Sequence, residues 1–380
     1  MTKYWDSEEI FLDGDHYFDR LLVDIDQAKE LITVEIYIFN DDNLGKKIAE
    51  KLIQAHQRGV EVQIVVDGVG SYGFFGRLHG LFLKAGIHVK MFHPLPFYHP
   101  MYRKLSFKKK FYAFFTRLGR MNQRNHRKII TIDSKIMFVG SYNFSIEHIQ
   151  EYKDKKWKDM GVRVAGKNVQ IALLHFKKIW KIRDYFRYRK TIKPLLATNL
   201  KYAPLRLNHS LFMKQFYYRD LLKRIDQAKN RIWLMTPYFI PKRNLILMLT
   251  KAAQRGVDVR ILISSKTDVK LFQSLQFFYY PYLAVKGVKI FQYVETVLHA
   301  KTFLIDDWMT IGTSNLNHRS ILHDLEVDLS IQDEKNKIKI VNDFIESTPP
   351  QHEITNENLK LRTVFDKFLA RLFFIFKYWF

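Results

Sequence analysis

Cysteine is absent from this 380-residue chain, and acidic residues are far fewer than basic ones. Without cysteine the protein contains neither a disulfide framework nor a zinc site built on thiolates. No segment offers the ~20 apolar residues that a transmembrane helix needs. The longest uncharged run, residues 271–285, is interrupted by Gln273, Ser274 and Gln276. The N-terminal residues 1–9 have no apolar signal region, so we expect neither a membrane span nor a secretory leader.

One short pattern of chemically active residues occurs twice. The pattern His-x-Lys-x-x-x-x-Asp is found at His126, Lys128 and Asp133 and again, 173 positions later, at His299, Lys301 and Asp306. Each copy is followed closely by a Gly-x-x-Asn, which ends at Asn143 in the first copy and at Asn315 in the second. A complete pattern that is present twice predicts one active site built from two similar halves.

The sequence around the two copies also repeats, in the same order. Residues 25–29 are identical to residues 225–229, residues 57–62 resemble residues 254–259, and residues 86–90 resemble residues 287–291. Matching blocks in a constant order indicate a duplicated domain. A chain of 380 residues is long enough for two such units, each with its own core.

Each half alternates helical and strand-like segments. Residues 17–29 place apolar side chains at helical spacing, and residues 31–39 form a β-branched run typical of a strand. Residues 44–56 read as a second helix that stops at Gly59, where a left-handed residue suits a helix C-terminus. Residues 60–66 then read as a buried strand, and the second half repeats this order. The pattern predicts an α/β fold with mixed, mostly parallel sheets covered by helices on both faces.

The two motifs run into the apolar stretches 129–132 and 302–305, which indicate strands. Because residues two apart on a strand point the same way, His126 and Lys128 should face one side together, as should their counterparts in the second copy. An imidazole beside a fixed ammonium suits chemistry on a phosphodiester, since the ring attacks or transfers a proton while the cation holds a phosphate oxygen. One copy alone would be explained as an exposed strand edge. Metal binding is disfavoured because lysine is not a usual ligand and no histidine pair has metal-ligand spacing.

These residues make the chain similar to the phospholipase D superfamily, and more closely to bacterial cardiolipin synthases. The resemblance rests on both motifs, on the sequences that end at the two asparagines, and on residues 125–129, 157–159, 236–241, 255–261, 298–301 and 326–329. It implies two similar α/β/α lobes related by a pseudo-twofold axis, with the active site at their interface. We expect the first lobe to comprise residues 1–195 and the second residues 196–333.

The resemblance also implies a two-step transfer through a covalent phosphohistidine, without a metal ion or cofactor. One histidine attacks the phosphorus, and the other protonates the leaving alcohol and then activates the incoming one. In the family the N-terminal motif usually supplies the nucleophile, which would be His126, with His299 as acid and base; the sequence alone leaves this order open.

The other motif residues have expected roles by the same resemblance. The phosphate oxygens would be held by Lys128, Lys301, Asn143 and Asn315. The catalytic motifs would be completed by Asp133 and Asp306, which would also support the local structure. The histidine rings would be oriented by Asp159 and Glu326. For the last two, an ordinary surface carboxylate is the alternative.

Basic and aromatic residues are concentrated in two segments of a chain with net charge +24, a pI near 9.8 and 15% aromatic residues. Residues 96–125, an insert that lengthens the first half, contain eight lysines or arginines, eight aromatic residues and no acid. Residues 176–193 form a second such run, part of which reads equally as a solvated helix face. These mixtures suit an anionic bilayer, where each cation adds roughly 1 kcal/mol and aromatic rings lie at headgroup depth. They also suit nucleic acid.

The C-terminus favours the membrane over nucleic acid. Residues 361–380 place their apolar side chains on one helical face, which is typical of a helix lying in the plane of a membrane interface. A helix docked on the protein's own core is the alternative. The polar residues 334–358 are predicted to link the second lobe to the amphipathic helix 359–380. We therefore expect peripheral association with the cytoplasmic face of a bacterial membrane, as in a cardiolipin synthase without N-terminal transmembrane helices.

The sequence thus predicts a membrane-associated phosphatidyltransferase that makes cardiolipin from two phosphatidylglycerols and releases glycerol. A phospholipase D-type hydrolase is the alternative if water is the preferred acceptor. A phosphodiesterase acting on nucleic acid is less favoured because of the C-terminal segment, and a non-enzymatic membrane-binding protein is disfavoured because both motifs are complete. The headgroups of donor and acceptor and the oligomeric state leave no trace in the sequence.

Overall fold

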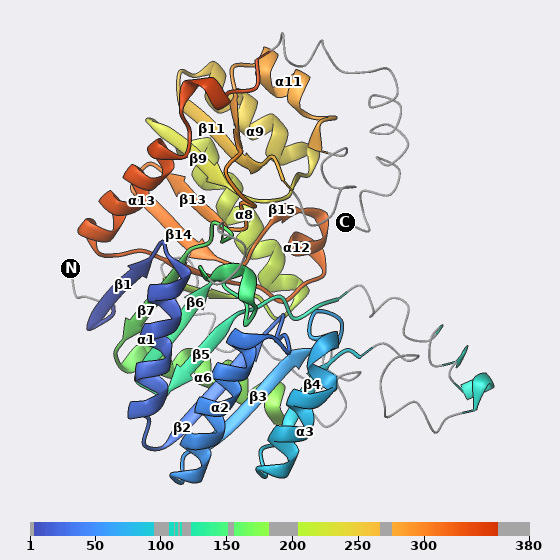
Figure 1. Ribbon diagram of the computed structural model, residues 1–380. Helices are drawn as coiled ribbons and strands as arrows, with labels where there is room; N and C mark the ends of the chain where they lie inside the picture. Colours follow the sequence, from blue (N-terminus) through green and yellow to red (C-terminus); the bar gives the residue numbers. More distant parts are fainter. Residues whose placement is uncertain are drawn as a thin grey trace.

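The described residues form two seven-stranded sheets, one in each half of the chain. Figure 1 shows the computed structural model. The structure describes residues 4–94, 106–109, 111–112, 115, 123–150, 156–181, 204–266 and 276–355. The two halves lie one above the other in Figure 1, and their sheets meet in the middle of the molecule.

The first sheet is built from strands between residues 7 and 165. They are β1 (Ser7–Phe11), β2 (Leu31–Ile36), β3 (Glu61–Asp67), β4 (Val89–Phe92), β5 (Ile129–Ile132), β6 (Ile136–Gly140) and β7 (Gly161–Ala165). Their order across the sheet is β1-β7-β6-β5-β2-β3-β4. β2 pairs in parallel with β3, as β3 does with β4, whereas the other neighbours are antiparallel.

The second sheet repeats this arrangement. Its strands are β8 (Leu205–Leu207), β9 (Arg231–Met235), β11 (Asp258–Ser264), β12 (Lys289–Tyr293), β13 (Thr302–Ile305), β14 (Trp308–Gly312) and β16 (Val327–Ser330). Read from its β8 edge, the order β8-β16-β14-β13-β9-β11-β12 corresponds strand for strand to the first sheet. Two short strands, β10 (Phe239–Ile240) and β15 (Leu316–Asn317), form a separate parallel pair.

The predicted α/β fold with two mixed sheets is confirmed, but the sheets are not mostly parallel. The alternation of helices and strands that suggested parallel pairing ends at β4 and β12. After the motif strands the chain turns back sharply, through left-handed residues at Asp133 (φ 50°), Ser134 (φ 57°) and Asp306 (φ 49°). Adjacent antiparallel strands need only such a tight turn, whereas parallel strands need a crossover. Antiparallel pairs therefore outnumber parallel pairs in both sheets.

Helices cover the sheets. They are α1 (Gly14–Gln27), α2 (Asn43–Gln57), α3 (Arg77–Lys84), α6 (Gln170–Lys181), α8 (Leu211–Gln227), α9 (Arg243–Gln254), α11 (Tyr280–Val285), α12 (His318–Leu322) and α13 (Glu334–Glu346), with short 3-10 turns at Tyr72–Phe75, Ile146–His148, Lys167–Val169 and Pro350–His352. Of these, α1 and α2 lie at the positions that the apolar spacing predicts. α2 and α9 both end at a left-handed glycine, Gly59 (φ 94°) and Gly256 (φ 90°). Glycine adopts this conformation without strain, which explains why the same block follows both helices.

Each lobe has a hydrophobic cluster of its own, and a further cluster contains buried side chains from both lobes. The buried side chains Met137, Val162 and Val164 of the first lobe belong to the same cluster as Leu304, Met309, Ile311 and Val327 of the second. These residues lie on β6, β7, β13, β14 and β16, so the motif halves of the two sheets pack against each other. Burial of this apolar surface fixes the relative position of the two halves of the site.

The structure contradicts the predicted linker at residues 334–358. Residues 334–346 form α13, which begins at the capping residue Asp333, whose side chain accepts a hydrogen bond from the Asn336 N–H. Phe344 is fully buried and stacks on Trp233 of the second lobe with ring centroids 5.0 Å apart. The polar composition concealed this helix because only one narrow side of it, at Ile340 and Phe344, enters the core.

α13 also contacts the first lobe. The Glu8 side chain accepts hydrogen bonds from the backbone N–H groups of Gln332 and Asp333 and from the Asn336 side chain. The helix therefore joins both lobes and is part of the folded body. The predicted amphipathic helix at residues 359–380 and the proposed boundary at residues 195 and 196 lie outside the described residues. Within the described part of the chain, no helix has the length and apolarity to cross a bilayer.

Candidate active site

Both motif histidines lie in extended segments just before their strands rather than within them. His126 precedes β5 and His299 precedes β13. Each segment pairs with a segment of the opposite lobe: the His126 N–H donates to the Leu325 carbonyl (3.0 Å), and the His299 N–H donates to the Lys158 carbonyl (2.8 Å). The chain positions next to these carbonyls carry Glu326 and Asp159. Backbone pairing across the interface thus brings each histidine to the acid of the other lobe.

His126 has a defined tautomer because acceptors face its Nδ1. This nitrogen lies 3.1 Å from the Thr313 carbonyl oxygen and 3.0 Å from Glu326 Oε2. A carbonyl oxygen accepts but never donates, so Nδ1 carries a proton and Nε2 of the neutral ring holds the lone pair. Burial, together with the positive charges of Lys128 and Lys301, lowers the pKa of His126 well below its usual value. The ring is therefore neutral, as a nucleophile must be.

Glu326 is buried, and three donors surround its carboxyl group. His126 Nδ1 and the hydroxyl groups of Thr313 and Ser320 donate to it. Burial raises the pKa of Glu326 to about 7, against the lowering effect of the two hydroxyl groups. The contact with His126 is thus a hydrogen bond to a neutral imidazole rather than a fully charged ion pair.

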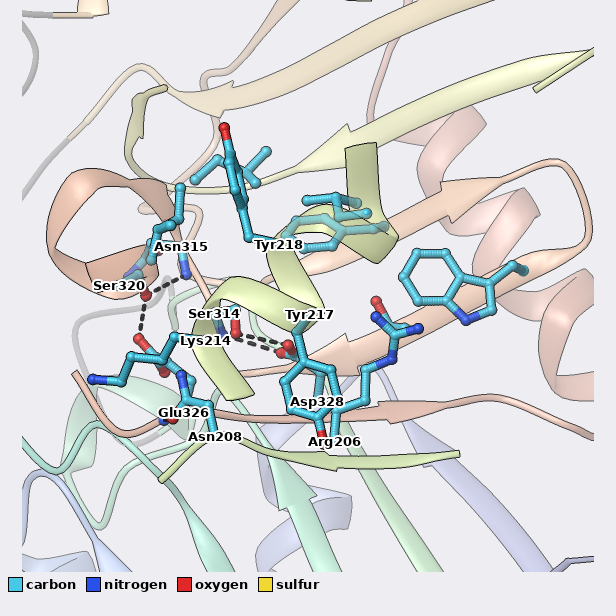
Figure 2. A pocket seen from close by; sticks show the side chains of 16 residues that line it. Arg206, Asn208, Lys214, Tyr217, Tyr218, Ser314, Asn315, Ser320, Glu326 and Asp328 are labelled. Atoms are coloured by element: carbon cyan, nitrogen blue, oxygen red, sulfur yellow. Dashed lines mark hydrogen bonds between the residues drawn. The ribbon is translucent and has the colours of Figure 1, made fainter. Parts of the chain in front are cut away.

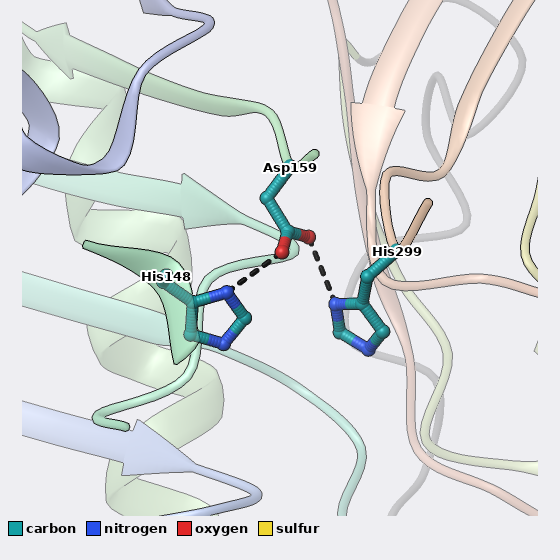
Figure 3. A group of neighbouring side chains, drawn as sticks. All are labelled: His148, Asp159 and His299. Carbon is teal, nitrogen blue, oxygen red and sulfur yellow. Dashed lines mark hydrogen bonds and ion pairs between the residues drawn. The ribbon is translucent and has the colours of Figure 1, made fainter. Parts of the chain in front are cut away.

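His299 is held in the same way by the first lobe. Its Nδ1 lies 2.8 Å from Asp159 Oδ1, and both side chains are buried. Burial acts to raise the pKa of Asp159, but His299 and His148 together hold it well below its usual value. The ionised carboxylate accepts the Nδ1 proton, so Nε2 lies on the far side of the ring from Asp159 (Figure 3). Burial lowers the pKa of His299 to about 3 despite this partner.

The two motif lysines are also buried and lie beside their histidines. Lys128 Nζ donates to the His126 carbonyl at 2.8 Å, and Lys301 Nζ donates to the His299 carbonyl. Lys128 also lies over the Tyr37 ring, 5.1 Å from its centroid. Burial and the neighbouring Lys301 lower the pKa of Lys128 to about 7. Two buried cations and two neutral imidazoles in one place form a site for an anion.

The two asparagines that follow the motifs are buried but differ in their contacts. Asn143 Oδ1 accepts a hydrogen bond from the Ile38 N–H at 3.2 Å. Asn315 Oδ1 is buried and has no hydrogen-bond partner among the described residues. The backbone N–H of Asn315 donates to Ser320 Oγ at 2.9 Å. The Asn315 side chain is therefore less committed to the protein's own structure than that of Asn143.

A small pocket lies behind Glu326 in the second lobe. Its volume is about 70 Å³, and Asn315, Ser320, Glu326 and Asp328 line it together with residues of α8. Figure 2 shows Ser320 between Asn315 and Glu326, with Ser314 hydrogen-bonded to Asp328. Neither motif histidine lines this pocket. The pocket therefore borders Glu326, the acid that orients His126.

Asp133 and Asp306 are not at the site. Asp133 accepts hydrogen bonds from the backbone N–H groups of residues 29–31, and Asp306 accepts from those of residues 229–231. Each carboxylate closes the turn at the far end of its motif strand and fastens the start of β2 or β9. Their inclusion among the catalytic residues is therefore not supported by their position, whereas the expected local structural role agrees with these contacts.

His148 and Ser320 are two residues at this site that the sequence analysis missed. His148 Nδ1 lies 2.7 Å from Asp159 Oδ2, and its Nε2 accepts a hydrogen bond from the Asn143 N–H at 3.2 Å. Ser320 makes the corresponding contacts in the second lobe, to Glu326 and to the Asn315 N–H. Both residues stand five positions after the motif asparagine. That shared offset was a signal in the sequence, but the change from histidine to serine concealed it.

The cluster of His148, Asp159 and His299 does not suit a metal ion, although its ligand atoms lie within 4.8 Å of one another. The Nε2 of His148 accepts a backbone hydrogen bond, so its neutral ring carries the proton on Nδ1, which faces Asp159. A metal ion there would require the same nitrogen to be bare. The tautomers therefore favour hydrogen bonding over coordination.

Comparison with known proteins agrees with this geometry. A family model described as "Cardiolipin synthase, PLD-like domain" matches residues 21–180 and 221–347. The chain belongs to this cardiolipin synthase family. A cardiolipin synthase of Staphylococcus aureus (strain Mu50) is 32% identical over 373 residues, which cover 95% of this chain and 71% of the relative. Cardiolipin synthase B of Salmonella typhi is 30% identical over 337 residues, or 86% of this chain and 76% of the relative.

A solved structure supports the two-lobed fold of this cardiolipin synthase family member. The phosphatidylserine synthase of Haemophilus influenzae Rd KW20 superposes with a TM-score of 0.70 and covers 98% of this chain and 95% of its own. Its sequence identity is 13%, so the likeness concerns the fold alone. The resemblance to the phospholipase D superfamily and to cardiolipin synthases is thus confirmed by the family match and the relatives.

Proposed function

We propose that the protein is a membrane-associated phosphatidyltransferase that makes cardiolipin from two phosphatidylglycerols through a phosphohistidine intermediate. One observation carries the proposal: two neutral histidines, each with Nδ1 held by an acid of the opposite lobe, lie with two buried lysines in one site. The names of the relatives that match this chain support the choice of product.

In the first step the Nε2 of His126 attacks the phosphorus of a phosphatidylglycerol. The new N–P bond forms as the bond from phosphorus to the glycerol headgroup oxygen breaks, and the His299 imidazolium gives its Nε2 proton to that oxygen. Glycerol leaves, and the phosphatidyl group stays on His126. His299 is then neutral and ready to accept a proton.

In the second step a headgroup hydroxyl of another phosphatidylglycerol enters. His299 removes its proton, the oxygen attacks the phosphorus, and the N–P bond to His126 breaks. The product is cardiolipin, and both histidines return to their starting protonation states. Because two neighbouring acids orient the rings, each Nε2 points toward the reacting phosphorus without a search among tautomers.

The cations of the site would stabilise the charge that develops on phosphorus. Lys128 and Lys301 would hold the non-bridging oxygens, and the side-chain amides of Asn143 and Asn315 would add donors. Burial is the larger cause of the lowered pKa of His126, and the same cations lower it further. A bound anionic phosphodiester offsets the effect of the cations on the histidine pKa. We infer that substrate binding itself raises the pKa of His299 and so supplies the protonated acid that the first step needs.

We further propose that the protein binds the cytoplasmic surface of a bacterial membrane through its basic, aromatic insert. Among the described residues of this insert, Phe107, Phe111 and Tyr112 are 75%, 51% and 73% exposed. Lys108 and Lys109 beside them are exposed as well. Exposed rings next to cations fit the headgroup region of an anionic bilayer, where the donor and acceptor lipids lie.

The proposal is tested by the products formed from defined lipids. Purified protein is incubated with phosphatidylglycerol vesicles, with and without a chelator, and the lipids are identified by mass spectrometry. We expect cardiolipin and free glycerol in equal amounts, no effect of the chelator, and no product with His126→Ala. Phosphatidic acid as the main product would instead identify a hydrolase, and cleavage of DNA but not of lipid would identify a nuclease.

A further inference from the structure

His148 occupies a place between the two halves of the site that neither motif contains. It lies at the end of the short turn Ile146–His148, and its ring is in contact with the rings of Tyr142, Trp157 and His299, at centroid distances of 5.8, 5.6 and 5.8 Å. The side chain is almost completely buried. The partners that face the two nitrogens of such a buried polar ring determine its tautomer.

Both nitrogens of His148 face groups that define their roles. Nε2 accepts the Asn143 N–H, and Nδ1 lies 2.7 Å from Asp159 Oδ2, at ion-pair distance but away from ideal hydrogen-bond alignment. Because a backbone N–H only donates, the Nδ1 atom carries the proton and turns it toward Asp159. Figure 3 shows Asp159 between the two rings, with one carboxylate oxygen toward each.

The position of this ring is fixed by the backbone around it. Gly14, the first residue of α1, passes so close to the His148 carbonyl that a Cβ atom on it would lie 1.8 Å from the carbonyl oxygen. No side chain fits there without moving the His148 backbone. The first helix of the first lobe therefore fixes the residue that contacts Asp159.

In the second lobe, different residues hold the acid that orients the motif histidine. Ser320 has the place of His148, and Glu326 has the place of Asp159. In the first lobe the longer donor side chain, His148, contacts the shorter acid, Asp159. In the second lobe the shorter donor, Ser320, contacts the longer acid, Glu326. The sum of the side-chain lengths is thus similar in the two halves, but an imidazole replaces a hydroxyl group.

We propose that His148 is a positioning residue for the second motif: it fixes Asp159 so that His299 keeps its Nδ1 proton and presents Nε2 for proton transfer. The inference rests on the proposed function, because the role of His299 as acid and base comes from it. Ser320 does the same for Glu326 and hence for His126. The exchange of a serine for a histidine then adapts one half of a duplicated site to proton transfer and leaves the other to nucleophilic attack.

The test compares two leaving groups. Glycerol must be protonated as it leaves, whereas p-nitrophenolate leaves unprotonated, so only the first needs His299 as an acid. We expect His148→Ala to lower kcat for cardiolipin formation by about 10- to 100-fold, less than the ~10⁴-fold loss when an orienting acid is itself disabled. KM should change less than about threefold, since no contact with bound lipid is lost. The initial burst of p-nitrophenolate from a phosphatidyl-p-nitrophenol should stay within about threefold of the unaltered protein.

Two further variants separate positioning from structural support. Ser320→Ala is the matched control, and it should slow the burst because it acts on the His126 side. The double variant His148→Ser with Asp159→Glu copies the pair of the second lobe, and it should recover at least about tenfold in kcat over His148→Ser alone. This comparison uses only His148→Ser and the double variant, so it remains valid even if His148→Ala does not fold.

The outcomes are distinct from a failure of the proposed function. If the unaltered protein releases p-nitrophenolate but makes no cardiolipin, the function is wrong. If it makes cardiolipin, equal slowing of the burst and of turnover by His148→Ala would overturn the inference, as would an unchanged kcat. No recovery in the double variant, with thermal unfolding unchanged from His148→Ser, would overturn it as well.

Discussion

Replacement of Asp306 tests whether the acids of the motifs are structural. Asp306 accepts hydrogen bonds from the backbone N–H groups of Lys229, Asn230 and Arg231, at 2.9, 2.9 and 3.1 Å. At about 0.5–1.5 kcal/mol for each hydrogen bond, three contribute about 1.5–4.5 kcal/mol. Water replaces part of the two exposed bonds, so we expect Asp306→Ala to lower the free energy of unfolding by about 1–3 kcal/mol.

The backbone conformation adds to this loss. Asp306 has a φ of 49°, in the left-handed region, which asparagine tolerates better than alanine does. Asp306→Asn also keeps one oxygen as an acceptor, so we expect it to lose about half as much stability as the alanine variant. Asp133 has the same place in the first lobe, and the losses of Asp133→Ala and Asp306→Ala should add because the two turns belong to different lobes.

The assay is thermal unfolding followed by cardiolipin formation per folded molecule. An unfolding entropy of about 2 cal/mol/K per residue over 380 residues gives roughly 0.8 kcal/mol/K, so Asp306→Ala should lower Tm by roughly 1–4 °C. Its kcat should stay within about threefold of the unaltered protein. A 100-fold loss of kcat with an unchanged Tm would refute the structural role.

The pH dependence of stability provides an independent check. Partial burial acts to raise the pKa of Asp306, but the three backbone donors lower it below its usual value. A carboxyl group whose pKa is depressed in the folded state stabilises the protein above its unfolded pKa and loses that effect as the pH falls through the folded pKa. The difference in stability between the unaltered protein and Asp306→Asn should therefore be full at pH 7 and shrink below about pH 4.

Two further predictions concern the lobe interface and the buried cation. Phe344→Ala should lower the free energy of unfolding, measured by denaturant titration, by about 3–5 kcal/mol. The cause is the cavity left by a fully buried ring that stacks on Trp233. A loss below about 1 kcal/mol would mean that α13 is not part of the folded body. The kcat/KM should fall as the pH rises through about 7. Burial and the neighbouring Lys301 lower the pKa of Lys128 to about 7 in the free site. Above that pH the amine of Lys128 is neutral and no longer holds a phosphate oxygen. The kcat profile should bend at higher pH, since the bound phosphodiester raises that pKa, and coincident profiles would contradict this assignment.

Much of the fold was predictable because the chain repeats itself. The early helices and strands of the first half follow from apolar spacing, and a glycine marks a helix end in both copies of the repeated block, Gly59 in the first and Gly256 in the second. The antiparallel half of each sheet was not predicted, since a turn at Asp133 consists of polar residues that resemble any loop. α13 was missed for a related reason, because polar residues surround Ile340 and Phe344, the two apolar side chains of this helix that are fully buried.

The site was predictable in its residues but not in its connections. The repeated motifs indicated His126 and His299, yet the sequence carries no sign that each ring contacts the acid of the opposite lobe. That arrangement depends on backbone pairing between segments about 140 and 200 residues apart. The burial of Asp159 and Glu326 likewise comes from the shared core between the lobes, so only the structure decides against an ordinary surface carboxylate.

The central claim is that His126 carries the phosphatidyl group while His299 transfers protons. The most direct measurement is to mix phosphatidyl-p-nitrophenol with His299→Ala, in which the activated leaving group needs no acid but the second step lacks its base. The account predicts one p-nitrophenolate released per protein molecule and a phosphatidyl adduct on His126, located by mass spectrometry of the digested protein. His126→Ala should give neither. An adduct on another residue, or cardiolipin formed with no adduct in either protein, would contradict the account.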